Sequence, residues 1–94
     1  MDELDLARQE MGLVDMAIIA SVIERMHIAR KMGAIKKANG LPVLPEGFTL
    51  DKALDARKEK ARGLGVEQGD VEIIGKVFAV LVQAAIDVEK EAVK

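Results

Sequence analysis

The sequence contains no cysteine, tryptophan or tyrosine, and among its 94 residues there are only one histidine and two phenylalanines. The absence of cysteine excludes disulfides and thiolate chemistry, and it is compatible with a reducing, cytoplasmic compartment. One histidine without cysteine offers too few ligands for a transition-metal site, so no metal is expected. Two aromatic residues are also too few for a surface on which nucleic-acid bases could stack.

The chain also lacks a dominant sign of charge and a long hydrophobic run. It has 14 Lys and Arg against 16 Asp and Glu, a net charge of −2, which leaves no basic footprint for nucleic acid. No apolar segment approaches the ~18 residues of a membrane span, and the acidic residues after Met1 do not form a secretory signal. We therefore expect one small cytoplasmic domain over residues 1–94, with no membrane or nucleic-acid partner.

The apolar pattern is strong, and its period is helical. No proline precedes Pro42, and the pattern over residues 3–38 predicts one uninterrupted helix about 54 Å long. Asn39-Gly40 is a typical C-terminal stop for such a helix. A helix of this length is too long to pack on the short remainder of the chain, and half of the residues are hydrophobic. We therefore expect a second copy of the chain beside it.

Two shorter helices are predicted after a loop that contains both prolines. Thr49 is the expected N-cap of a helix over about residues 50–62. Asp70 is the expected N-cap of a third helix over about residues 71–92. No segment has a convincing strand pattern, so the predicted fold class is all-α, with three helices per chain.

Arg25 occupies a position where the apolar seam of the first helix requires a hydrophobic side chain. A guanidinium group cannot lose its proton, and burying it without a partner is expensive, so an anionic group must meet it. Lys36 follows three turns later on the same face, about 16 Å along the helix. Glu89 lies on the apolar side of the third helix. The two cations on one inward-facing stripe predict a pocket for an acidic ligand.

Other polar residues of the first helix have simpler interpretations. Arg8 lies roughly 100° around the helix from Arg25, so both can serve one pocket only if a second chain intervenes. Asp15 is interpreted as an ion-pair partner between helices, and His27 as an exposed side chain. Gly63-Leu64-Gly65 is interpreted as a helix stop and not as a phosphate loop. No serine, histidine and aspartate are spaced to form a nucleophilic triad.

The spacing of these charges resembles that of a known family, the AroQ class of chorismate mutases, which are all-α. Near the other end, Glu89 follows Phe78 by eleven residues, as a Gln or Glu does in the last helix of the family. The first-helix residues that carry the resemblance are Arg8, Asp15, Glu24-Arg25 and Lys36.

The resemblance implies an isomerase, an intramolecular transferase that converts chorismate to prephenate in the phenylalanine and tyrosine branch of the shikimate pathway. It implies no cofactor or metal, and a homodimer in which two chains intertwine into a six-helix bundle. Arg25 and Arg8 of the other chain would bind the carboxylates of the substrate. Lys36 would bind a carboxylate and donate to the ether oxygen, and a protonated Glu89 would donate to the same oxygen. The implied catalytic residues are Arg25, Lys36 and Glu89.

The chain departs from the family pattern in the second helix. The Arg-Glu pair that opens this helix in the family falls on Phe48 and Thr49 when residues are counted without gaps. With an insertion, Lys52 is the nearest cation and the expected substrate ligand, and Arg57 is the second choice. Ala85 replaces a serine of the family. These departures keep three alternatives open: an isochorismate–pyruvate lyase, an aminodeoxychorismate mutase, or a non-catalytic helical dimer.

Overall fold

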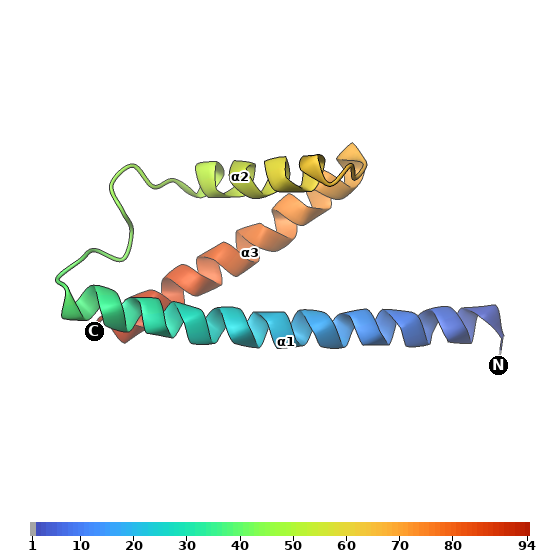
Figure 1. Ribbon diagram of the computed structural model, residues 1–94, viewed down its shortest axis with the longest axis horizontal. Helices are drawn as coiled ribbons and strands as arrows, with labels where there is room; N and C mark the ends of the chain where they lie inside the picture. Colours follow the sequence, from blue (N-terminus) through green and yellow to red (C-terminus); the bar gives the residue numbers. More distant parts are fainter. Residues whose placement is uncertain (1) are drawn as a thin grey trace.

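The computed structural model describes residues 2–94, which form three helices without any strand. Helix α1 spans Glu3–Ala38, α2 spans Leu50–Gly63 and α3 spans Gln68–Ala92. Helix α3 runs back from the end of α2 to the C-terminal end of α1 and packs against both, whereas α1 and α2 do not touch each other (Figure 1). The predicted all-α class and the number of helices are confirmed.

The ends of α1 and α2 lie where the capping residues predict them. The Asp2 side chain accepts a hydrogen bond from Asp5 N at 2.8 Å and caps the start of α1. Asn39 is the C-cap, and Gly40 follows in the left-handed region with φ +64°, which only glycine adopts without strain. Thr49 caps α2 by accepting from Lys52 N at 3.1 Å. The bounds of α1 and the Thr49 cap are therefore confirmed.

The predicted start of the third helix is wrong by one turn. The N-cap is Glu67, whose extended backbone leads into the helix and whose carbonyl accepts from Val71 N at 3.0 Å. Asp70 lies inside the first turn, where its charge meets the positive end of the helix dipole. Because the Glu67 side chain makes no capping hydrogen bond, the true start carries no side-chain signal in the sequence. Gly65, with φ +78°, separates α2 from α3 and confirms the predicted helix stop.

The core is small and lies mainly along α3. Its buried apolar residues are Ala29, Ala61, Val71, Val82 and Ile86. Helices α1 and α3 cross most closely at Gly33, where a Cβ atom would lie 2.6 Å from Ala92 Cβ and 3.0 Å from Glu89 O. Only glycine allows this approach, and it brings the last turns of α1 against the last turns of α3.

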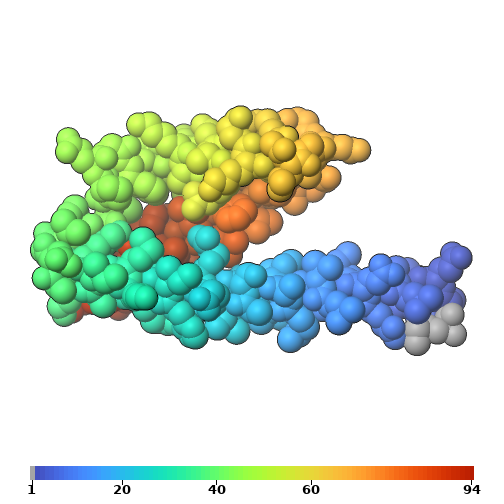
Figure 2. Space-filling model, viewed as in Figure 1, coloured from blue at the N-terminus to red at the C-terminus, as the bar shows by residue number. Residues whose placement is uncertain are grey.

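The first half of α1 has no neighbour in the chain. Every residue from Asp2 to Ser21 is exposed, and the helix projects beyond α2 and α3 (Figure 2). The radius of gyration is 16.7 Å, whereas a compact domain of this length would have one of about 12 Å. Many of the exposed side chains are large and apolar, and they include Leu4, Leu6, Met11, Leu13, Val14, Met16, Ile18, Ile19 and Ile23. None of the helices within residues 2–94 is long and apolar enough to cross a bilayer.

Candidate functional site

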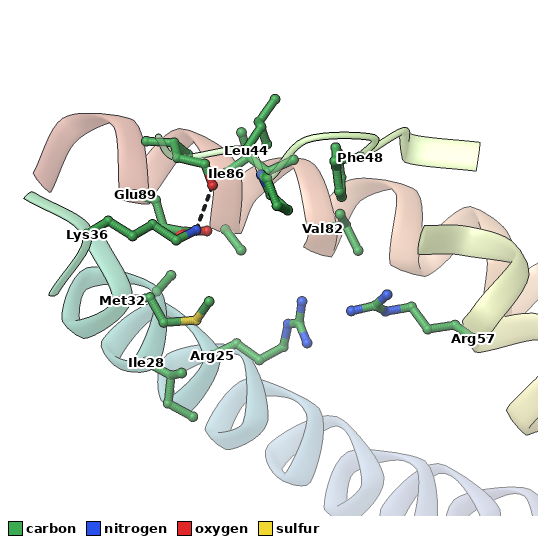
Figure 3. Close-up of a pocket in the computed structure, with 14 residues that line it drawn as sticks. Arg25, Ile28, Met32, Lys36, Leu44, Phe48, Arg57, Val82, Ile86 and Glu89 are labelled. Carbon is green, nitrogen blue, oxygen red and sulfur yellow. Dashed lines mark hydrogen bonds and ion pairs between the residues drawn. The ribbon is translucent and has the colours of Figure 1, made fainter. Parts of the chain in front are cut away.

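A pocket of about 380 Å³ opens between the second half of α1, the loop before α2, and the inner faces of α2 and α3. Its polar lining consists of Arg25 and Lys36 from α1, Arg57 from α2 and Glu89 from α3 (Figure 3). The rest of the wall is apolar, so charges inside it are poorly screened by water. The apolar lining residues are Ile28, Ala29, Met32, Val43, Leu44, Pro45, Phe48, Val82, Ala85 and Ile86.

Lys36 and Glu89 form an ion pair in the wall of the pocket. Lys36 Nζ donates to Glu89 Oε1 at 2.5 Å and to the carbonyl oxygen of Val43 at 2.6 Å. Glu89 is only 6% exposed, so its carboxylate depends on this ammonium group for compensation. An ammonium group carries three N–H donors, and the two bonds leave one for a ligand. The close crossing at Gly33 holds the two helices in the position that makes this pair possible.

Arg25 reaches into the middle of the pocket without a polar partner for its inner nitrogen. Its Nε atom is buried, and no acceptor within residues 2–94 meets it. Such an unpaired donor normally costs about 1–3 kcal/mol, because desolvation is not repaid by a hydrogen bond. A carboxylate in the pocket would remove that penalty. Arg25 is therefore a donor positioned for an anionic ligand.

Arg57 enters the pocket from the opposite side, and its guanidinium group points toward that of Arg25 (Figure 3). Its Nη1 atom donates to the carbonyl oxygen of Ala53 at 2.9 Å, one turn back on α2. Among the ion pairs of residues 2–94, none involves Arg25 or Arg57. Three cations thus face one carboxylate, and with Glu89 ionised the pocket carries a formal charge of +2.

The structure brings together Arg25, Lys36 and Glu89, the three residues predicted to be catalytic. Lys52, the expected cation of the second helix, lies outside the pocket and is exposed, with Nζ 3.3 Å from the carbonyl oxygen of Gly47. Arg57, the second choice from the sequence, is the α2 cation in the pocket wall. Arg8 lies on the bare half of α1, the exposed part up to Ser21 that contacts no other helix. Its Nη1 atom lies 3.6 Å from Asp5 Oδ1.

The surroundings of His27 and Asp15 can also be compared with their interpretation from the sequence. His27 is exposed, as predicted. Asp15 is also exposed, and it takes part in no ion pair between described residues of this chain. The part of the chain that the structure describes holds no cluster of three or more His, Asp or Glu side chains that could bind a metal ion.

The pocket can bind and polarise a ligand, but its lining has no hydroxyl, thiol or imidazole group for covalent attack. No Ser, Thr, Cys or His is among the fourteen residues that line it in the described chain. What the pocket offers is a set of donors that are held in place before a ligand arrives, which is the arrangement that stabilises developing negative charge. The fold and pocket together define an all-helical protein with a site for an anionic small molecule.

Comparison with known protein families identifies the family to which this chain belongs. A family model described as chorismate mutase type II matches residues 7–90, which include Arg8, Arg25, Lys36, Arg57 and Glu89. The match covers most of the chain, so the chain belongs to the chorismate mutase type II family, and the resemblance stated from the sequence is confirmed. Searches among curated proteins and among solved structures gave no significant match.

Proposed function

We propose that this protein is a chorismate mutase that rearranges chorismate to prephenate, a step of aromatic amino acid biosynthesis. The observation that carries the proposal is the charge of the pocket. Arg25, Lys36 and Arg57 line the pocket together with a single carboxylate, that of Glu89, and the buried Nε of Arg25 lacks an acceptor. Chorismate carries two carboxylates, so it is a dianion that suits a pocket with an excess of positive charge.

The rearrangement is a concerted pericyclic step that needs no nucleophile and no cofactor. The protein has to hold the compact conformer of the substrate and to stabilise negative charge that grows on the ether oxygen. In our proposal, Arg25 and Arg57 bind carboxylates, in the bidentate form that guanidinium groups favour. Arg57 thereby takes the role first expected of Lys52.

Lys36 and Glu89 act on the ether oxygen in this proposal. Lys36 has one N–H left after its bonds to Glu89 and to the carbonyl of Val43, and this donor can reach the substrate. Glu89 can donate to the same oxygen only when its carboxyl group is protonated.

A second copy of the chain completes the site in this proposal. The accessible surface is 7067 Å², whereas a folded monomer of 10.2 kDa would expose about 5,300 Å². The excess agrees with the bare apolar half of α1, which would be covered in an intertwined six-helix homodimer. Arg8, at the uncovered end of α1, would then enter the pocket of the partner and bind a substrate carboxylate.

A second candidate activity follows from the side chains that α2 contributes to the pocket. Arg57 is the one α2 residue in the pocket wall within the described chain, and it brings no carboxylate to read the ring hydroxyl of chorismate. Isochorismate and aminodeoxychorismate differ from chorismate in their ring substituents, so an isochorismate–pyruvate lyase or an aminodeoxychorismate mutase would suit the same cations.

Product analysis with each substrate tests the proposal. The purified protein is incubated separately with chorismate, isochorismate and aminodeoxychorismate, loss of substrate is followed by absorbance, and the products are separated by chromatography. We expect prephenate from chorismate at the highest kcat/KM of the three. Release of pyruvate from isochorismate as the faster reaction would favour the lyase. No turnover and no binding of a bicyclic transition-state mimic would favour the non-catalytic dimer.

A further inference from the structure

Phe78 on α3 contacts the two arginines that face each other across the pocket. The guanidinium carbon of Arg25 lies 5.7 Å from the centre of the Phe78 ring, and that of Arg57 lies 5.4 Å from the same centre. Both distances are within the ~6 Å at which a cation is attracted by the negative face of an aromatic ring. Phe78 is half-buried and does not line the pocket, so it acts on the arginines and not on a ligand.

The contact with Phe78 offsets the repulsion between the two arginines in the pocket. Two guanidinium groups that point at one another repel, and no carboxylate of residues 2–94 is paired with either. Arg57 is held at one nitrogen by the carbonyl of Ala53, while the inner nitrogen of Arg25 has no acceptor. The Phe78 ring is therefore the attractive group that both cations share before a substrate binds. In a half-buried site this attraction is stronger than in water.

We propose that Phe78 is a positioning residue that holds Arg25 and Arg57 together as one two-guanidinium clamp for the dianionic substrate. The inference rests on the proposed function and adds a residue to its machinery. Without the electron-rich ring face, the two side chains would spread apart, and substrate binding would have to bring them together again. The loss would then appear as weaker binding of substrate and transition state, with the fold intact.

The test uses fluorinated phenylalanines at position 78. Successive fluorine atoms withdraw electrons from the ring face and weaken cation–π attraction, while the size of the side chain changes little. Site-specific incorporation of mono-, di- and trifluorophenylalanine at Phe78 should lower kcat/KM for chorismate stepwise, by about tenfold over the whole series. The dissociation constant of a bicyclic dicarboxylate transition-state mimic should rise in parallel, and the melting temperature should stay within a few degrees.

The same series at Phe48 is the control, because the chain has only these two aromatic residues. Phe48 lines the pocket, but no guanidinium group of residues 2–94 lies over its ring. A steeper slope at Phe78 than at Phe48 supports the inference, and equal slopes or a flat series at Phe78 overturn it. Phe78→Leu keeps the apolar bulk but removes the aromatic ring, so this single substitution should lower kcat/KM as much as the whole fluorinated series. The mimic's dissociation constant decides this test even if product analysis assigns another reaction to the pocket.

Discussion

The two halves of α1 are both rich in large apolar side chains, but their surroundings are very different. Residues 22–38 face α3 and the pocket, and they include the buried Ala29 and Gly33. Residues 3–21 are just as rich in large apolar side chains, yet all of them are exposed, and Leu13 is 74% exposed. These apolar side chains point in all directions around the helix, a pattern typical of a helix covered on every side. The difference shows that only one half of α1 is packed by its own chain, and it supports our proposal that a second copy covers the other half.

Replacing Arg25, which lies on the packed half of α1, should have the largest effect on activity. Replacing Arg25 with Ala removes a preorganised donor from the middle of the pocket, and such donors contribute about 3–4 kcal/mol to transition-state stabilisation. We expect Arg25→Ala to lower kcat/KM for chorismate by roughly 10²- to 10³-fold, as measured in a continuous absorbance assay.

Arg30→Ala is the matched control for this change. Arg30 lies on the same half of α1, but it is exposed and outside the pocket. Its removal should change kcat/KM by less than threefold, since an exposed arginine contributes little. A loss of under tenfold in Arg25→Ala, or equal losses in the two variants, would remove Arg25 from the site.

The bare half should respond most strongly to a charge placed on its apolar surface. Leu13→Glu changes nothing inside a single chain, but in a dimer it buries a carboxylate without a partner. We expect the dimer dissociation constant to rise on the order of 100-fold, with loss of activity at low protein concentration. Analytical ultracentrifugation measures the first effect and the assay the second. Gln9→Glu adds the same charge where the side chain is already polar and should weaken the dimer far less.

The crossing at Gly33 links the packed half of α1 to the Lys36–Glu89 ion pair. Gly33→Ala places a methyl group 2.6 Å from Ala92 Cβ, so α1 and α3 must move apart, and Lys36 must separate from Glu89. We expect a loss of about 1–3 kcal/mol in urea unfolding and roughly tenfold in kcat/KM. In Gly69→Ala the same methyl group meets nothing within 4 Å, so that variant should be at least as stable as the wild type. If Gly33→Ala behaves like Gly69→Ala, the close approach does not position the site.

The effect expected from Glu89→Gln is a change in how kcat depends on pH. If Glu89 must be protonated to donate, wild-type kcat should fall by up to about tenfold per pH unit on the alkaline side. The amide of glutamine donates without titrating, so Glu89→Gln should keep its rate where the wild type loses it. A wild-type rate that stays level from acid to alkaline pH would exclude a protonated Glu89. An equal alkaline fall in both forms would show that Glu89 is not the group responsible.

The sequence predicted best what depends on local signals. The length and the end of α1 follow from the absence of proline and from Asn39-Gly40, and the start of α2 follows from the Thr49 hydroxyl. The start of α3 was wrong because its cap, Glu67, uses only its backbone. The placement of Arg25, Lys36 and Glu89 in one pocket agrees with their helical spacing. Their mutual distances could not be predicted, since these depend on the helix crossing at Gly33.

The cation of α2 required the three-dimensional structure. Five residues separate Lys52 from Arg57, and this turns the helix by about 140° in net terms, so the two side chains leave α2 on different faces. The loop before α2 has no hydrophobic periodicity, so its sequence does not indicate which face of α2 packs against α3. The contacts of Phe78 with both arginines were missed for the same reason, because they join residues from three helices. Phe78 was visible in the sequence only as part of an apolar stripe.

The central claim is that cations from two chains meet in one pocket, and subunit complementation tests it most directly. Arg8→Ala and Arg25→Ala chains are purified separately, each expected to be nearly inactive, then mixed, unfolded and refolded together. Random pairing makes half of the dimers mixed, and each mixed dimer has one site with both arginines, so about a quarter of wild-type activity should return. Activity no greater than the sum of the separate variants, or full activity of Arg8→Ala by itself, would show that each site lies within a single chain.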